Sequence, residues 1–263
     1  MKSPAPRILR VEGLSCQLGG KPILQGLTLP ALSGGLVALL GPNGSGKSTL
    51  LRSIAGLAPA RFDTLSLNGQ DLRGLPARVR ADTIRYLPQF LPEAIHLTVT
   101  EALLVALHAR GGLSTAAAME RGIAALDTLG IRELGPRFLD ELSGGQKQLV
   151  GLAQALADQP AVLLLDEPLA SLDLNFQHHA MLLLKRLAAD QGLLVLIVVH
   201  DLNIALRYAD TALLLHQGRL LAAGEPRSVI TPASIAQAFQ VRARVEPCSL
   251  GYANVLVDDL IQP

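Results

Sequence analysis

A glycine-rich segment, GPNGSGKST at residues 41–49, limits the possible folds of this chain more than any other feature. It follows an apolar run at residues 36–40 that is typical of a buried strand. It leads into residues 49–57, whose apolar side chains recur at helical spacing. A glycine turn between a strand and a helix is the context that the phosphate-binding pattern G-x-x-x-x-G-K-[ST] requires. We therefore predict a P-loop, and with it a nucleotide-binding α/β core.

Each residue type in this loop suits one part of phosphate binding. Gly41, Gly44 and Gly46 carry no Cβ, so backbone N–H groups can close around phosphate oxygens. The helix that follows adds partial positive charge at its first turn. Lys47 can reach the β- and γ-phosphates, and the Ser48 hydroxyl is a candidate ligand for Mg²⁺. The residues of this loop that we predict to bind ATP are Gly41, Pro42, Asn43, Gly44, Ser45, Gly46, Lys47, Ser48 and Thr49.

The composition favours a large apolar core and argues against some classes of function. Of the 263 residues, 49% are hydrophobic and 17% are charged, and a net charge of +1 gives no general attraction to nucleic acid or acidic lipid. Cys16 and Cys248 are expected to be reduced thiols. We predict no signal peptide, and the longest apolar run, residues 193–199, is too short to cross a bilayer. Any membrane role is therefore expected to come through a partner.

Apolar runs and turns along the chain predict an α/β fold built on a sheet. Residues 161–165 and 193–199 are continuously apolar, which is typical of strands that are covered on both faces of a mostly parallel sheet. Residues 8–40 alternate short apolar runs with glycine turns and predict an antiparallel β subdomain at the N-terminal end.

A block of helical pattern interrupts this core. It covers about residues 91–158, and no proline- or serine-rich linker flanks it, so we predict a helical subdomain inserted into a single ATPase domain, residues 1–263. The C-terminal tail, about residues 225–263, is expected to hold one helix near residues 233–239 and some short apolar runs.

Two acidic residues follow the apolar strand at residues 162–165. Ligands bind at the carboxyl ends of strands in open α/β sheets, so acids at this position are candidates for chemistry. Asp166 is predicted to hold Mg²⁺, directly or through water. Glu167 can accept a proton from, or orient, a water molecule that attacks the γ-phosphate. The alternative is a pair of acids in a solvated turn.

Two other polar residues stand at strand ends. His200 ends the apolar strand at residues 193–199 and can hydrogen-bond the γ-phosphate while keeping Glu167 aligned. Asp201 is expected to cap the next helix. Gln89 stands where the core meets the helical block, and its amide can bind Mg²⁺ or the attacking water.

The segment LSGGQKQ at residues 142–148, followed by a helix, is the second specific signal. Small residues at the start of a helix form an anion site. Because the P-loop already supplies one such site, a second is expected to close over a nucleotide held by another copy of the chain.

With these motifs the chain resembles the ATP-binding subunits of ABC transporters along essentially its whole length. The order and spacing of the motifs agree with that family. The corresponding parts are residues 41–49 for Walker A, Gln89 for the Q-loop, residues 142–146 for the signature motif, residues 162–166 for Walker B, Glu167 for the catalytic glutamate, residues 171–173 for the D-loop and His200 for the switch histidine.

The resemblance implies a head-to-tail homodimer that buries two ATP molecules with Mg²⁺. Each ATP would lie between the P-loop of one copy and the signature and D-loop of the other. The pair would drive two membrane-spanning permease subunits from the cytoplasmic face of the inner or plasma membrane, and would serve a solute-binding protein indirectly. The residues of the second copy that would face the nucleotide are Ser143, Gly144, Gly145, Gln146 and Asp173.

A narrower resemblance concerns the transported solute. The short helical insertion, the run HDLN at residues 200–203 and the tail segments at residues 231–232 and 238–243 are similar to importers of iron–siderophore complexes, haem or cobalamin. Two alternatives remain: a soluble ABC-type ATPase scaffold, for example in iron–sulfur assembly or DNA maintenance, and an exporter ATPase. Neutral charge and the absence of a long coiled coil argue against the DNA version.

The chain departs from the family at the position that stacks on adenine, where Leu18 replaces the usual aromatic residue. Leucine can pack on the base but loses an aromatic stacking contribution of about 0.5–1.5 kcal/mol. We predict comparable affinities for ATP and GTP, measured by equilibrium titration of each nucleotide. A strong preference for ATP would show that other groups recognise the base.

Overall fold

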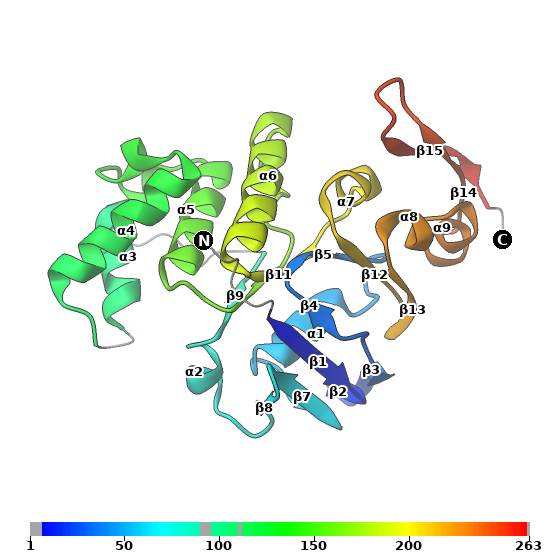
Figure 1. The fold of residues 1–263 in the computed structure, drawn as a ribbon, viewed down its shortest axis with the longest axis horizontal. Helices are drawn as coiled ribbons and strands as arrows, with labels where there is room; N and C mark the ends of the chain where they lie inside the picture. The colour runs from blue at the N-terminus through cyan, green and yellow to red at the C-terminus, as the bar shows by residue number, and fades with distance from the viewer. Residues whose placement is uncertain (1–6, 90–95, 110–111, 262–263) are drawn as a thin grey trace.

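The computed structural model describes residues 7–89, 96–109 and 112–261, and its centre is a six-stranded sheet in the order β13-β12-β5-β11-β10-β9 (Figure 1). Neighbouring strands run parallel except β12 and β13, which form an antiparallel hairpin. This confirms the predicted mostly parallel sheet. The strands are β5 (Gly35–Leu40), β9 (Ile84–Leu87), β10 (Val162–Leu165), β11 (Leu194–Val198), β12 (Thr211–His216) and β13 (Arg219–Gly224).

Two small antiparallel sheets form the N-terminal part, as predicted. One has the order β4-β1-β7-β8 and the other β3-β2-β6. Together with helix α1 (Lys47–Ile54) they bury one hydrophobic cluster against one face of the central sheet, where Leu50, Leu51 and Ile54 are fully buried. The strands are β1 (Ile8–Glu12), β2 (Leu14–Leu18), β3 (Lys21–Leu27), β4 (Leu32–Ser33), β6 (Ala60–Arg61), β7 (Thr64–Leu67) and β8 (Gln70–Asp71).

The inserted block is helical and lies at one end of the molecule (Figure 1). A capping box begins its first helix: the Thr98 hydroxyl accepts from the N–H of Glu101, whose carboxylate accepts from the N–H of Thr98. Gly130 ends the second long helix in the left-handed conformation. The expected start of the block at residue 91 lies outside the described residues. Its helices are α3 (Val99–His108), α4 (Thr115–Leu129), η1 (Arg132–Leu134), η2 (Leu139–Glu141) and α5 (Gly144–Ala157).

A second hydrophobic cluster covers the other face of the central sheet. It joins α6 (Leu174–Gln191) and α7 (Leu202–Tyr208) to the inserted helices and to β11. Short α2 (Ala77–Arg80) precedes β9. Among the described residues, no helix is both long and apolar enough to cross a membrane.

The C-terminal tail is more ordered than its sequence pattern indicates. The predicted helix is present as α9 (Pro232–Phe239), with short α8 (Pro226–Val229) before it. Beyond it, strands β14 (Val241–Pro247) and β15 (Ala253–Leu260) form a hairpin that packs on α9 and α7. We expected only short apolar runs there. The alternation of apolar and charged residues in VRARVEP is the strand signal that this expectation missed.

Two hairpins turn through similar pairs, Asn68-Gly69 and Gln217-Gly218, with all four residues at positive φ. A Cβ added at Gly218 would collide with the backbone oxygen of Ile23, whereas a Cβ at Gly69 would meet nothing within 4 Å. The Gly218 N–H also donates to the Ser45 carbonyl of the P-loop at 3.1 Å. The second turn therefore supports the P-loop, and the first does not.

We predict that Gly218→Ala lowers the free energy of unfolding by about 2–4 kcal/mol, because left-handed strain and a backbone shift add together. The matched variant Gly69→Ala carries the strain alone and should lose about 1 kcal/mol. Chemical denaturation gives both values, and a nucleotide titration should show weaker binding for Gly218→Ala only. Equal losses in the two variants would contradict this account.

Candidate functional site

Three adjacent strands, β5, β11 and β10, end at the same edge of the central sheet. The P-loop follows β5, Asp166 and Glu167 follow β10, and His200 comes shortly after β11. Gln89 comes after β9, the next strand in the sheet. Parallel order thus brings together four segments that are far apart in the sequence.

The P-loop is held in shape by its own backbone and by Lys47. The Lys47 side chain is buried, and its Nζ donates to the carbonyl oxygens of Gly41 at 2.8 Å and Pro42 at 3.0 Å. Burial lowers the pKa of Lys47, and the nearby charges of Glu167 and Asp166 oppose that shift. No side chain caps α1, so none competes with an anion for its first N–H groups.

Both the backbone conformation and a close backbone contact require a glycine at position 41. Its φ of 144° lies in the region that favours glycine, and a Cβ there would collide with the backbone oxygen of Leu215 at the end of β12. The β12–β13 hairpin therefore packs against the loop at Gly41 and is hydrogen-bonded to it at Ser45.

Asp166 is buried, and each of its carboxylate oxygens accepts a hydrogen bond. The Ser48 hydroxyl donates to Oδ1 at 3.0 Å and the Tyr86 hydroxyl donates to Oδ2 at 3.0 Å. Burial raises the pKa of Asp166, and both hydrogen bonds oppose that rise because they favour the ionised form. Burial also raises the pKa of Tyr86, which keeps its hydroxyl a donor. No role was predicted for Tyr86 from the sequence.

Glu167 brings together the residues predicted to be catalytic. Its carboxylate oxygens contact two side chains, Gln89 through Nε2 at 2.6 Å and His200 through Nε2 at 2.7 Å. Glu167 has a positive φ of 51°, an uncommon conformation for a residue with a side chain. The His200 side chain is 48% exposed, so this cluster opens to the surface.

Gln148 connects α5 to this cluster. Its side chain is buried, and its Nε2 donates to the backbone oxygen of Gln89 at 2.7 Å. Gln148 belongs to the motif at residues 142–148, but no role was predicted for it from the sequence. A polar residue next to Leu149 on a helix with an otherwise apolar buried face was the available signal.

The remaining predicted site residues lie elsewhere. Ser143 and Gln146 form a capping box at the start of α5, and Asp173 caps α6. Among the described residues, no hydrogen bond or ion pair joins Ser143, Gln146 or Asp173 to the P-loop. Leu18 ends β2 with 39% of its surface exposed.

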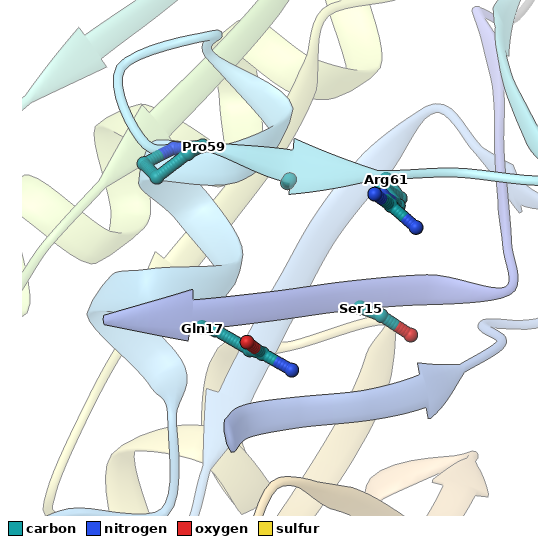
Figure 2. A pocket seen from close by; sticks show the side chains of 5 residues that line it. Ser15, Gln17, Pro59 and Arg61 are labelled. Atoms are coloured by element: carbon teal, nitrogen blue, oxygen red, sulfur yellow. The ribbon is translucent and has the colours of Figure 1, made fainter. Parts of the chain in front are cut away.

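A hollow on the antiparallel part of the molecule is separate from this cluster. Figure 2 shows Ser15 and Gln17 projecting from β2 toward it. Side chains alternate along a strand, so these two lie on the face of β2 opposite to Cys16 and Leu18. None of the predicted nucleotide-binding residues lines this hollow, whose lining is Ser15, Gln17, Pro59, Ala60 and Arg61.

The family model described as ABC transporter matches residues 24–170. The chain is 41% identical over 249 residues to the hemin import ATP-binding protein HmuV of Gloeobacter violaceus, which covers 90% of this chain and 89% of that protein. This chain belongs to the ABC transporter family. It is an ATP-binding subunit of that family and an ATPase.

Two more members of the ABC transporter family show the extent of the likeness. The cobalamin import ATP-binding protein BtuD of Halobacterium salinarum is 38% identical over 241 residues, which cover 90% of this chain but 60% of that protein. A solved inward-facing ABC transporter ascribed to the metal-chelate type aligns with a TM-score of 0.80 at 26% identity, over 96% of this chain and 98% of that one. These comparisons confirm the α/β P-loop fold and the resemblance on which our sequence analysis relied.

Proposed function

We propose that this ABC ATPase works as a pair of identical copies that powers import of haem, cobalamin or an iron–siderophore complex. The observation that carries the catalytic part is the Glu167 carboxylate, held by Gln89 and His200 at the strand ends beside the P-loop. The import part is supported by two relatives that are named as hemin and cobalamin import ATP-binding proteins.

The residues beside the P-loop fit Mg²⁺. The Ser48 hydroxyl lies 3.0 Å from Asp166 Oδ1, so two oxygen donors of the kind that Mg²⁺ prefers are already adjacent. The amide oxygen of Gln89 is proposed as a further ligand. When bound, the ion would neutralise charge on the phosphates. Lys47, now held by the carbonyls of the loop, would turn to the phosphate oxygens.

Glu167 is proposed as the general base for the attacking water. A carboxylate oxygen that accepts one hydrogen bond keeps a second lone pair, so the contacts to Gln89 and His200 leave room for a water. The same contacts limit rotation of the carboxylate. His200 is proposed to align Glu167 and the γ-phosphate.

The signature segment is proposed to serve the nucleotide of the partner copy. The start of α5 is capped by its own side chains and is not joined to its own P-loop by the hydrogen bonds or ion pairs of the described residues. Small residues leave room for an anion at this helix start, and a γ-phosphate presented from outside would take the place of its side-chain caps. The residues with this proposed role are Ser143, Gly144, Gly145, Gln146 and Asp173, with Leu18 packing on the base of its own nucleotide.

The dimer is proposed to act on two permease subunits at the cytoplasmic face of the membrane. A solute-binding protein would be an indirect partner. Co-purification with a multi-span membrane protein, followed by uptake assays with haem, cobalamin and iron chelates, tests this part. Recovery without any membrane protein would favour the soluble scaffold instead.

Replacing the proposed base tests the chemistry. We predict that Glu167→Gln lowers ATP turnover by at least about 100-fold, because an amide of the same shape cannot take the proton. ATP affinity should stay close to that of the wild type. The matched variant Glu120→Gln changes an exposed glutamate on α4 and should have wild-type turnover. Phosphate release gives the rates, and wild-type turnover of Glu167→Gln would exclude this role.

A second prediction tests sharing between copies. Gly145 is a poor probe, because a Cβ there would lie 3.0 Å from the backbone oxygen of Ser171 in the same chain. Ser143→Asp retains an N-cap but adds negative charge where the partner's phosphate would lie, so turnover should fall at least about tenfold by like-charge repulsion. Ser114→Asp, at the N-cap of α4, is the matched control and should leave ATP turnover unchanged.

Mixing inactive variants makes this test sharper. A copy with Ser143→Asp and a copy with Lys47→Met together form one intact site, since each site takes its P-loop from one copy and its signature from the other. The mixture should regain about a quarter of wild-type turnover, because half of the dimers are mixed and each has one intact site. A mixture as inactive as its components would contradict sharing.

A further inference from the structure

Tyr86 contacts the proposed cation ligand directly from a neighbouring strand. Its Cα pairs with that of Leu164 in the parallel ladder between β9 and β10, and Asp166 comes two residues after Leu164, directly after the end of β10. The Tyr86 ring packs against the hydrophobic cluster that includes Leu164, and the hydroxyl reaches Asp166 Oδ2 at 3.0 Å.

The two hydrogen bonds on Asp166 act in a complementary way. Ser48 donates to Oδ1, the oxygen on the P-loop side, while Tyr86 donates to Oδ2. A carboxylate with both oxygens held cannot rotate freely about its last bond, so its orientation is set before a ligand arrives. If Ser48 turns toward a bound cation, Tyr86 is the donor that still holds Asp166.

We propose that Tyr86 is a positioning residue for Mg²⁺: it holds Asp166 Oδ2 so that Oδ1 faces the cation beside Ser48. The inference rests on the proposed function, in which Asp166 and Ser48 hold Mg²⁺. Tyr86 itself does not touch the nucleotide in this account. It acts through the orientation of Asp166.

A purely structural role for Tyr86 makes a different prediction. The partly buried hydroxyl has Asp166 as its hydrogen-bond partner, and in a purely structural role its loss would loosen the sheet edge. In that case heat stability and nucleotide binding would change whether Mg²⁺ is present or absent. A positioning role changes only the part of nucleotide binding that depends on Mg²⁺.

The test measures binding of a fluorescent ATP analogue to the purified full chain over a range of Mg²⁺ concentrations and in excess EDTA. Tyr86→Phe removes one oxygen and keeps the ring. We expect the Mg²⁺ concentration for half-maximal enhancement of binding to rise about three- to tenfold, because Asp166 keeps the hydrogen bond from Ser48 and loses only one of the two that orient it. Binding in EDTA and the melting temperature should stay close to the wild type.

Two further variants make the outcome decisive. Tyr252→Phe removes the same atom from a half-exposed tyrosine in the C-terminal hairpin and should leave the Mg²⁺ dependence unchanged. In an Asp166→Asn background, Tyr86→Phe should add little, because the carboxylate that it orients is gone.

The two proposals fail in distinguishable ways. If Mg²⁺ does not enhance nucleotide binding to the wild type, the proposed cation site is wrong. If Mg²⁺ enhances binding to the wild type but Tyr86→Phe keeps the wild-type Mg²⁺ dependence, only the role of Tyr86 is overturned. The role of Tyr86 is also overturned if Tyr86→Phe weakens nucleotide binding as much in EDTA as in Mg²⁺.

Discussion

The parallel order of β5, β11 and β10 is the constraint on which the rest of the site depends. Because these strands are buried side by side, each delivers its next residues to one edge of the sheet. A slip of one residue between β10 and β11 would displace Glu167 from His200 by about 3.3 Å, the rise of one strand residue. Their contact is 2.7 Å long and would not survive it. The register of these strands therefore determines whether the Glu167 and His200 side chains can meet, just as it determines how the strands pack.

Glu167 shows how the fold stabilises an unfavourable local conformation at this edge. A left-handed backbone at a residue with a side chain costs about 1–2 kcal/mol. Hydrogen bonds to a charged group contribute about 1.5–3 kcal/mol each, and Glu167 has contacts to Gln89 and His200. Two such contacts are enough to offset the strain. The same contacts that align the carboxylate therefore also allow its backbone conformation.

The sequence predicted the fold class and the segments that carry the P-loop, Asp166 and Glu167, because these depend on local patterns such as apolar runs and glycine spacing. It did not predict Tyr86 or Gln148, because their roles depend on which strand and which helix lie beside them. The C-terminal hairpin was missed for another reason. The alternation in β14 is regular, but in β15 it is interrupted by the extra residue of a bulge, Asp258, and most residues of β15 are exposed.

Hydrogen bonds through Gln89 connect the helical block to the sheet edge that carries the P-loop and Glu167. The Gln148 side chain on α5 holds the backbone of Gln89 at 2.7 Å, and the side chain of Gln89 holds Glu167 at 2.6 Å. The helix that carries Gln148 begins at the signature segment. A rigid movement of α5 relative to the sheet must therefore either carry Gln89 with it or break one of these two hydrogen bonds. A movement that carries Gln89 with α5 changes its contact with the Glu167 carboxylate, so the position of α5 and the alignment of the proposed base are coupled for as long as the hydrogen bond from Gln148 to Gln89 holds.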